Sequence, residues 1–414
     1  MTTSLPPSVT SLMTYLDASP TPFHAASRAV AELVARGYTA VTRLAGGLPA
    51  RGVMVVDGSV IAWSLGSPGA PLRILGAHTD SPNLRVQPRA DVPSPFASQI
   101  GVEVYGGVLL NSWLDRDLGV AGRVVSSEGE VVLFSGPAAV ARIPQLAIHL
   151  DRDVSERGLI LDKQAHLVPV WGTSTATFDD WLREVSGVSK IAAFDAHLFD
   201  MTPASLVGHD SSLLSSARLD NQVSCWAAVE AMASHSPGET TALMVLNDHE
   251  EVGSSSATGA AGPLLSDVIE ALCQQENLDA AARRDRIAQS WCLSADNAHA
   301  IHPNYPERHE PRHAPRINAG PALKLNGNQR YATSARGAAH VTRVAEQAGV
   351  PLQIFMSRNN MPCGSTIGPI TATVLGIEAI DVGVPQWAMH SARETCGADD
   401  PPRLASLMSA FIAG

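Results

Sequence analysis

Two adjacent carboxylates, Glu250 and Glu251, stand a few residues after an apolar run, residues 241–246, that has the length and composition of a buried strand. Neighbouring carboxylates at the end of a strand are poor packing residues. One of them can ligate a metal ion while the other takes a proton from a metal-bound water, which is the division of labour that a hydrolase needs. Taken alone, the pair could equally lie in a solvated loop, so this interpretation depends on finding further ligands.

Further side chains that suit metal binding stand near the ends of other predicted strands. Residues at the carboxyl ends of strands in an open α/β sheet converge even when they are far apart in sequence. Two histidines and three carboxylates suffice for two metal ions that share one bridging carboxylate, an arrangement that activates a water and stabilises oxyanion charge. The candidates are His78 and Asp80 after residues 72–75, Asp220 within 216–221, Asp296 after 291–295, and His390 after 377–382.

Each candidate also has an ordinary structural explanation. A lone histidine such as His78 or His390 is more often a loop or core residue than a ligand. Asp220 and Asp296 each precede a plausible helical or turn segment and could be helix N-caps. Their repeated position at strand ends favours a shared site over five independent explanations.

Two motifs suggest other chemistry, and their context argues against it. His309-Glu-Pro-Arg-His313 matches the H-E-x-x-H zinc motif, which requires a helix that places both histidines on one face. Three prolines at positions 306, 311 and 315 disfavour that helix. The segment Gly253-Ser-Ser-Ser-Ala-Thr-Gly259 lacks the spacing of a phosphate-binding loop, which predicts a small-residue turn near the site instead.

The bulk composition narrows the class of protein. With 45 % apolar and 17 % charged residues over 414 positions, the chain is a folded protein long enough for two or three domains. A net charge of −11 without basic runs argues against a nucleic-acid partner. There is no apolar stretch of membrane-spanning length and no signal-peptide pattern in residues 1–7, so we expect no membrane association and a soluble, cytoplasmic protein.

The five cysteines are odd in number, widely spread and free of C-x-x-C pairs. This pattern argues against a disulfide framework and against a thiolate zinc site. Any metal should therefore be held by histidine and carboxylate side chains, which suit exposed catalytic zinc or manganese.

The predicted elements divide the chain into an α/β domain and a β-rich insertion. Alternating helices and strands after residue 211 are typical of βαβ units, so we expect a mostly parallel sheet with helices on both faces. Residues 88–210 are rich in hairpin signals, among them 102–105 with 108–110 and 122–125 with 131–134. The predicted domains are residues 1–87 plus 211–414, a catalytic α/β domain that would carry the two metal ions, and the insertion 88–210.

The boundaries of the predicted elements follow from hydrophobic period and turn residues. A helix is expected from about Thr21, and residues 53–56 and 60–63 should form a hairpin around Asp57-Gly58. Strands are expected at 72–75, 241–246, 291–295, 352–356 and 377–382, and helices at 218–233, 263–276, 334–348, 364–375 and 403–412.

The motifs, in this order, resemble those of the M18 family of metallo-aminopeptidases, specifically the aspartyl aminopeptidases. The similarity spans nearly the whole chain, and the complete set in family order is far more specific than any single motif. Its segments are Ser19-Pro-Thr-Pro-Phe-His-Ala25, Gly76-Ala-His-Thr-Asp80, Trp113-Leu-Asp-Arg-Asp117, Ser216-Ala-Arg-Leu-Asp-Asn221, Asp248-His-Glu-Glu-Val-Gly-Ser254, Ser294-Ala-Asp-Asn-Ala-His299, Asn326-Gly-Asn-Gln-Arg-Tyr331, Met361-Pro-Cys-Gly-Ser-Thr366 and His390-Ser-Ala-Arg-Glu394.

The resemblance implies a role for each candidate residue. His78 and Asp296 would hold one zinc ion, Glu251 and His390 the second, and Asp220 would bridge both. Glu250 would be the general base, and Asp80 would orient the His78 imidazole. Substrate contacts would come from His299, Lys324, Tyr331 and His149, the last presented by the insertion to the active site of a neighbouring subunit.

The resemblance also implies a zinc-exopeptidase-like fold for the α/β domain. It implies an assembly as well, a tetrahedral dodecamer in which the insertion mediates dimerisation and the active sites face an interior cavity. Two departures from the family pattern lie on the substrate side. Gln145 stands where many relatives have His, and Leu325 and Gly327 vary the segment around Lys324.

These observations lead to one functional hypothesis with stated alternatives. We expect an exopeptidase that removes an N-terminal residue, preferably Asp or Glu, from peptides through a metal-bridging water, with Glu250 as general base. We expect two zinc ions per subunit, although manganese or cobalt suit the same ligands. The alternatives are a two-metal aminopeptidase of neutral specificity, a related deacylase, or a non-catalytic family member that forms a compartment.

Overall fold

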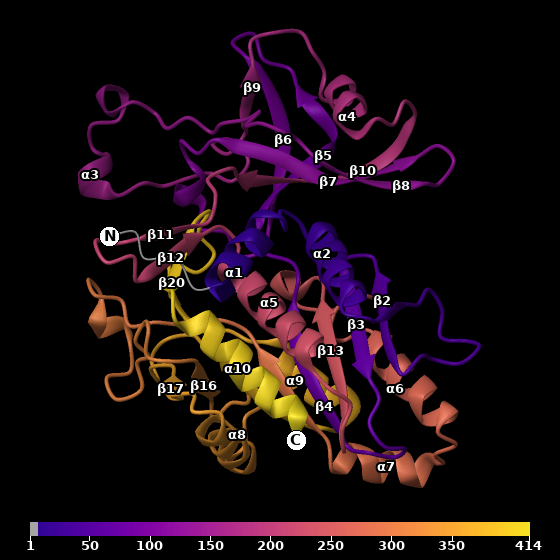
Figure 1. Cartoon of the computed structure of the whole chain (residues 1–414). Coiled ribbons are helices and arrows are strands. Elements are labelled where there is room, and N and C mark those ends of the chain that lie inside the picture. The colour runs from indigo at the N-terminus through magenta and orange to yellow at the C-terminus, as the bar shows by residue number, and fades with distance from the viewer. Residues whose placement is uncertain (1–6) are drawn as a thin grey trace.

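The computed structural model describes residues 7–414 and has a mixed α/β fold built on three sheets (Figure 1). The N-terminal residues 1–6, which cover most of the stretch searched for a signal peptide, lie outside the described residues. Between residues 7 and 414, no helix combines the length and apolar character needed to cross a membrane.

The largest sheet has nine strands and positions most of the candidate residues. Parallel pairs join β13 to β4, β4 to β14 and β14 to β18 in its centre, while antiparallel pairs occur at β2–β3, β3–β13 and β18–β16. In spatial order the strands are β1 (Thr39–Ala40), β2 (Arg51–Val56), β3 (Ser59–Ser64), β13 (Thr241–Asn247), β4 (Leu72–His78), β14 (Trp291–Ala295), β18 (Glu378–Gly383), β16 (Ala322–Leu325) and β17 (Gln353–Met356).

Helices cover both faces of this sheet because alternate residues of its strands are buried in different cores. Leu75 and Met244 belong to one apolar cluster, and their neighbours Ile74 and Leu243 belong to the other. The first face carries α1 (Pro7–Asp17), α2 (Pro22–Ala35), α5 (Leu219–Ser234), α8 (Ala335–Gln347) and α10 (Asp400–Ala413). The second carries α6 (Leu264–Gln275), α7 (Ala280–Ala288) and α9 (Ile367–Leu375).

A six-stranded antiparallel sheet with its own apolar core lies above the nine-stranded sheet in Figure 1. Its strands, in spatial order, are β8 (Val131–Ser135), β7 (Leu118–Ser126), β10 (Ile191–Asp200), β5 (Asn83–Val92), β6 (Ser98–Tyr105) and β9 (Val170–Gly172). Helix α4 (Phe178–Ser186) packs on it, and the short helix α3 (Val154–Arg157) lies on an arm that projects from it. Because β5 crosses residue 88, this sheet begins before the predicted insertion does.

A small third sheet connects the two larger parts near the candidate site. It contains β11 (Ser205–Val207), β12 (Leu213–Ser216), β20 (Glu394–Gly397), β19 (Pro385–Trp387) and β15 (Ala298–His299). Within residues 7–414 there are also four short 3-10 helices: η1 (Leu110–Trp113), η2 (Ile148–Leu150), η3 (Glu250–Val252) and η4 (Pro306–Arg308).

Most elements that the sequence predicts are present within a few residues of their expected bounds. The two hairpins 53–56/60–63 and 122–125/131–134 are confirmed as β2–β3 and β7–β8. The helix expected near Thr21 begins at Pro22, and the Thr21 hydroxyl accepts a hydrogen bond from the His24 amide at 3.4 Å. Helices α1, α4 and α7 were not predicted from the sequence.

The hairpin predicted around Gly106-Gly107 is wrong. Strand β6 ends at Tyr105, pairs with β5 and β9, and is followed by η1 instead of a returning strand. Gly106 has a φ of +74° and lies against Glu251, where a Cβ atom would approach the Glu251 Cβ to 3.1 Å. These glycines therefore allow the chain to pass close to the candidate site, and they do not form a hairpin turn.

Candidate active site

The candidate residues gather at the carboxyl ends of three neighbouring parallel strands. His78 is the last residue of β4, Asp296 follows β14, and the pair Glu250-Glu251 lies in η3, three residues after β13 ends. The strand order β13–β4–β14 makes these ends adjacent, which is where open α/β sheets form their sites. Asp220 joins them from the first turn of α5, where its backbone departs from helical dihedrals.

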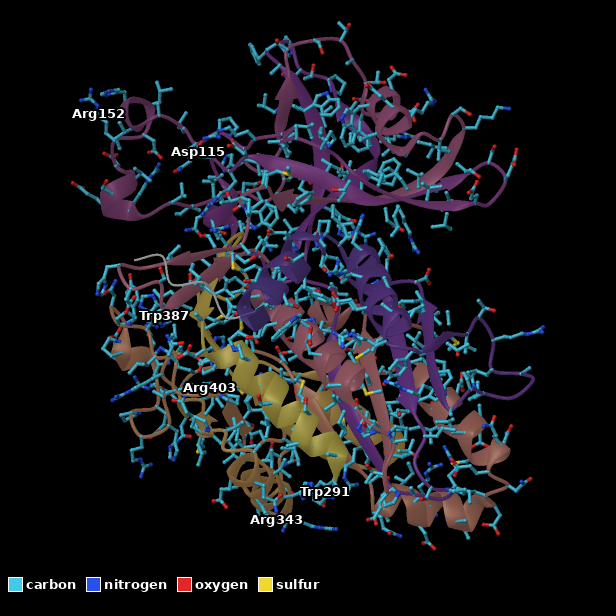
Figure 2. The ribbon with its side chains drawn as sticks, in the orientation of Figure 1. Asp115, Arg152, Trp291, Arg343, Trp387 and Arg403 are labelled. Carbon is cyan, nitrogen blue, oxygen red and sulfur yellow. The ribbon has the colours of Figure 1, made fainter. Side chains whose placement is uncertain are left out.

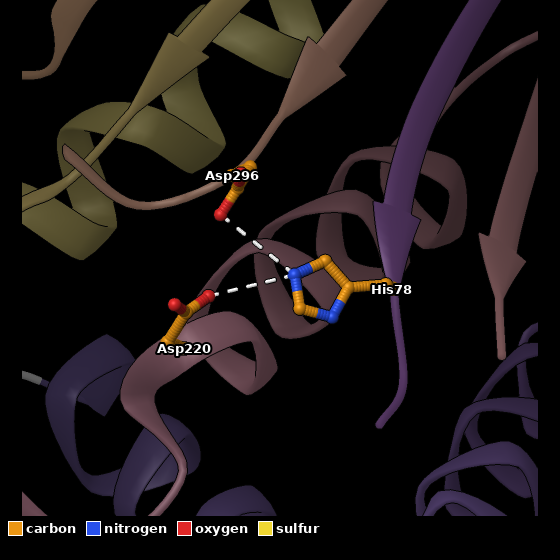
Figure 3. Close-up of side chains that lie close together, drawn as sticks. All are labelled: His78, Asp220 and Asp296. Atoms are coloured by element: carbon orange, nitrogen blue, oxygen red, sulfur yellow. Dashed lines mark ion pairs between the residues drawn. The ribbon is translucent and has the colours of Figure 1, made fainter. Parts of the chain in front are cut away.

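His78, Asp220 and Asp296 form the first group of potential metal ligands (Figure 3). The Nε2 atom of His78 lies 3.5 Å from Asp220 Oδ1 and 3.7 Å from Asp296 Oδ1. All three residues are buried, and Figure 3 shows them converging from β4, α5 and the end of β14. One imidazole nitrogen and two carboxylate oxygens therefore face a common point.

Glu251, His390 and Asp220 form the second group. His390 Nε2 lies 3.4 Å from Glu251 Oε2 and 3.5 Å from Asp220 Oδ2. Asp220 thus directs one carboxylate oxygen toward each group, as a bridging ligand would. The N-cap explanation for Asp220 is wrong, because within residues 7–414 no backbone amide donates a hydrogen bond to its carboxylate, and Oδ1 has no partner.

The charge and hydrogen bonding of these groups fit a bound cation. Among the residues that the structure describes, Asp220 Oδ1 and Glu251 Oε1 are buried without a hydrogen-bond partner. Burial alone would lower the pKa of His78, but hydrogen bonds to three aspartates outweigh it and raise that pKa well above its usual value. A site that demands positive charge and offers imidazole and carboxylate donors suits zinc.

Asp80 connects His78 to the loop that carries the two glutamates. The Asp80 carboxylate accepts hydrogen bonds from the backbone amides of Glu250 and Glu251, at 3.0 and 3.1 Å, and from the Tyr105 hydroxyl at 2.7 Å. His78 Nδ1 lies 3.1 Å from the Asp80 carbonyl oxygen and 3.4 Å from its carboxylate. Donation from Nδ1–H to this residue leaves Nε2 free to bind a metal.

Tyr105→Phe should lower the affinity for zinc by about tenfold, because Asp80 loses a donor that fixes its orientation behind His78. Competition against a metallochromic chelator would measure the change. Tyr305→Phe is the matched control, since it removes the hydroxyl of a tyrosine that is 56 % exposed. An unchanged affinity in Tyr105→Phe would contradict the proposed link.

Glu250 lies close to both groups, and together with His78 and Glu251 it forms a third set whose ligand atoms lie within 4.8 Å of one another. Its carboxyl lines a cavity of about 530 Å³ together with residues of both metal groups. Burial, supplemented by the neighbouring aspartates, raises the pKa of Glu250 to about 7. A carboxyl group that changes protonation near neutral pH, next to a potential metal site, can accept and return a proton.

His299, Lys324 and Tyr331 line the same cavity. Lys324 is only 2 % exposed, and its Nζ lies 3.4 Å from Asp296 Oδ2 and 5.1 Å from the centre of the Tyr331 ring. Enclosure by protein and the charge of Lys324 lower the pKa of His299 to about 4, so its imidazole is neutral at neutral pH. The cavity thus pairs a cluster of carboxylates with one buried ammonium group.

Comparison with known proteins identifies the family. The model of the family described as aminopeptidase I zinc metalloprotease (M18) matches residues 15–412. The chain belongs to the M18 family. It is therefore a zinc metallo-aminopeptidase.

Individual M18 relatives resemble the chain over nearly its whole length. A "Probable M18 family aminopeptidase 2" of Streptomyces coelicolor is 46 % identical, with 97 % of this chain and 96 % of the relative aligned. The structure of Ape4 in its complex with Nbr1 matches with a TM-score of 0.93 at 32 % identity, covering 98 % of this chain and 85 % of that one. The mApe1 dodecamer of S. cerevisiae matches with a TM-score of 0.82 at 26 % identity, covering 97 % and 95 %.

One predicted site residue of this M18 enzyme lies elsewhere. His149 belongs to η2, on the arm that also carries α3 and Arg152 (Figure 2), and it does not line the cavity. Its neighbours Leu146, Ile148 and Leu150 are 64 %, 52 % and 74 % exposed. Within one chain the structure therefore does not bring His149 to the other candidates, and its role stays a prediction about a neighbouring subunit.

Glu394, which was not singled out from the sequence, contacts residues of both groups of potential ligands. Its buried carboxylate accepts hydrogen bonds from the backbone amides of Asp220, at 2.8 Å, and His390, at 2.6 Å. Burial and the nearby Asp220 carboxylate raise the pKa of Glu394 to about 8. Its position four residues after His390 in the same motif was a signal that could have drawn attention to it.

Proposed function

We propose that this M18 zinc aminopeptidase releases N-terminal Asp or Glu from peptides and uses Glu250 as its general base. The observation that carries the proposal is the placement of Asp220, whose two carboxylate oxygens each lie 3.5 Å from a different histidine, His78 and His390. A carboxylate shared between two donor groups is what a two-metal hydrolase requires.

We assign the metal ligands from this geometry. His78 and Asp296 would hold one zinc ion, Glu251 and His390 the other, and Asp220 both. When bound, the two ions would polarise the scissile carbonyl and lower the pKa of a water between them. Manganese or cobalt could occupy the same donors.

The chain's own groups would move the proton. Glu250 would take a proton from the attacking water and deliver it to the leaving amine, a task suited to a carboxyl whose pKa is raised to about 7. Burial raises the pKa of Tyr331, so its hydroxyl stays protonated and can donate to the developing oxyanion. His149 of a neighbouring subunit is the second candidate donor for that oxyanion.

Lys324 is the proposed partner of the substrate's side-chain carboxylate. A buried ammonium beside the cavity would favour an acidic side chain strongly, because a charge-assisted hydrogen bond is worth most where water is excluded. Its contact with Asp296 leaves its other two N–H donors for a substrate.

Lys324→Met should lower the ratio of kcat/KM for Asp-anilide over Leu-anilide by at least about tenfold, since it removes a hydrogen bond to a charged group. Steady-state kinetics on both anilides would measure this ratio. Lys163→Met, at an exposed lysine, is the matched control. Equal losses on the two substrates would refute the assignment of Lys324.

One observation favours a second candidate, an aminopeptidase of neutral specificity. Asp296 Oδ2 lies 3.4 Å from Lys324 Nζ and partly neutralises the charge that would select acidic residues. The zinc-loaded enzyme should be assayed on Asp-, Glu- and Leu-anilides, together with N-acyl substrates that reveal a deacylase. Faster release of Leu than of Asp and Glu would select the neutral alternative.

We further propose that the chain forms a homo-oligomer, a tetrahedral dodecamer. The support is the similarity to the S. cerevisiae mApe1 dodecamer and the exposed apolar side chains around His149. Residues 88–210 would then be the dimerisation domain, interrupting a catalytic domain of residues 1–87 and 211–414. The cytoplasmic location stays a prediction from the sequence.

A further inference from the structure

A second cavity of about 450 Å³, which we call the arginine cavity, adjoins the active-site cavity. Its walls come from the end of β16 with the loop that follows it, up to residue 330, and from the end of β17 with the loop that follows it, up to residue 363. These loops leave the sheet side by side, because Leu325 and Met356 are paired in the parallel register of β16 and β17. Arg330 lines both cavities, so the two spaces meet at this residue.

The arginine cavity carries positive charge without an opposing carboxylate. Arg330 and Arg358 are among its lining residues, and none of the others is Asp or Glu. Arg330 Nε donates a long hydrogen bond of 3.4 Å to the Gly364 carbonyl, and the Arg358 guanidinium donates to the Glu307 carbonyl. Across residues 7–414, no ion pair joins either arginine to an acidic side chain. Each guanidinium therefore keeps donors for a further acceptor.

The burial of Lys324 and the exposure of Arg330 indicate the direction in which a bound peptide would run. Lys324, the proposed partner of the N-terminal side chain, is buried, whereas Arg330 is exposed. An exopeptidase encloses the free amino end of its substrate, so the remaining residues must leave toward solvent. A peptide held by its first residue at the metal site would pass Arg330 and enter the arginine cavity.

We propose that the arginine cavity binds a carboxylate in the part of the peptide that follows the scissile bond. This carboxylate is either the side chain of Asp or Glu at the second or third position or the C-terminal carboxylate of a short peptide. Arginine suits it because the planar guanidinium binds carboxylates through paired hydrogen bonds. The inference rests on the proposed function, and it extends the acidic preference beyond the first residue.

Matched peptides separate the two sources of the carboxylate. Asp-Glu-Ala-amide and Asp-Gln-Ala-amide differ only in a side-chain charge, and Asp-Gln-Ala with a free C-terminus adds only a terminal charge. For the zinc-loaded enzyme we expect kcat/KM to rise about five- to tenfold with one or both added carboxylates, the range for a charge-assisted contact that stays partly hydrated. Whichever pair shows the increase identifies the source.

Substitutions test whether the two arginines cause this increase. The double variant Arg330→Gln/Arg358→Gln should bring the ratio between charged and neutral peptides to about one, and Arg330→Lys should retain part of it. Arg312→Gln is the matched control, because it removes a guanidinium whose side chain is 82 % exposed and lies outside the cavity. Equal ratios in the wild type and the double variant, or an equal loss in Arg312→Gln, would overturn the proposal.

A binding measurement distinguishes failure of this inference from failure of the proposed function. Fluorescence anisotropy of the same labelled peptides with the Glu250→Gln enzyme reports carboxylate-dependent affinity without turnover. If the wild type releases no Asp while this affinity difference persists and vanishes in the double variant, the proposed function is wrong and the arginine cavity is supported. If release of Asp is normal and neither rate nor affinity depends on the added carboxylate, only the arginine cavity is wrong.

Discussion

Glu250→Gln should keep both zinc ions and lower kcat by at least about 100-fold, the usual range for the loss of a general base. The amide is nearly isosteric with the carboxylate, so the cavity and the metal groups should retain their geometry. It cannot accept the proton of the attacking water, because an amide oxygen is far less basic than a carboxylate. Zinc content by elemental analysis and kcat on an Asp-anilide would be measured on the same sample.

Two comparisons make this result specific to Glu250. Glu239→Gln, at an exposed glutamate, should leave both zinc content and kcat unchanged. Glu251→Gln should instead reduce zinc binding, because it weakens one of the assigned ligands. Retained activity in Glu250→Gln would remove this residue from the role of base, and lost zinc would show that it is needed to hold the metal.

The residues of the proposed ligand groups could be located from the sequence because most of them lie at the ends of predicted strands. Apolar runs of strand length locate the ends of β4 and β14, and the parallel arrangement brings His78 and Asp296 to one edge. For the H-E-x-x-H motif, the prediction that its residues do not form a helix is confirmed. Residues 309–313 contain no helix, and Glu310 instead pairs with His313 at 2.7 Å.

The role of Tyr105 could not be predicted from the sequence, because a tertiary contact decides it. Nothing local to Tyr105 indicates that β6 ends beside Asp80, 25 residues earlier in the chain. The hairpin predicted at Gly106-Gly107 failed for a related reason. The same glycine pair that permits a tight turn also permits a close approach to Glu251 and His390, and a sequence pattern does not distinguish the two.

His149 and Lys324 show two further limits of the sequence. The position of His149 relative to an active site depends on how subunits assemble, which the fold of one chain does not determine. Lys324 could be named as a substrate contact from the sequence, but its burial and its contact with Asp296 became visible only in the structure. A sequence motif gives only the order of residue types. Substrate specificity also depends on whether a charged side chain, such as Lys324, is already paired with a neighbouring opposite charge.

Asp220→Asn should weaken zinc binding at both positions together, each by at least about 100-fold, because one substitution alters a ligand that the two groups share. Asp220 Oδ1 faces His78 and Oδ2 faces His390. Asparagine keeps a single oxygen and no negative charge, so it can serve at most one group and attracts a cation less at either. Stepwise zinc titration, followed by calorimetry and elemental analysis, would resolve the two affinities.

Asp296→Asn provides the comparison that tests bridging itself. Asp296 Oδ1 lies 3.7 Å from His78 Nε2, and this residue belongs only to the first group of ligands. Its substitution should therefore weaken one zinc position and leave the group of Glu251 and His390 with its affinity largely intact. If Asp220→Asn instead lost one zinc ion and held the other as tightly as the wild type does, Asp220 would be an ordinary terminal ligand. The two-metal mechanism would then need a different bridging carboxylate. Between residues 7 and 414, the one other carboxylate that shares a ligand group with each of the two histidines is Glu251.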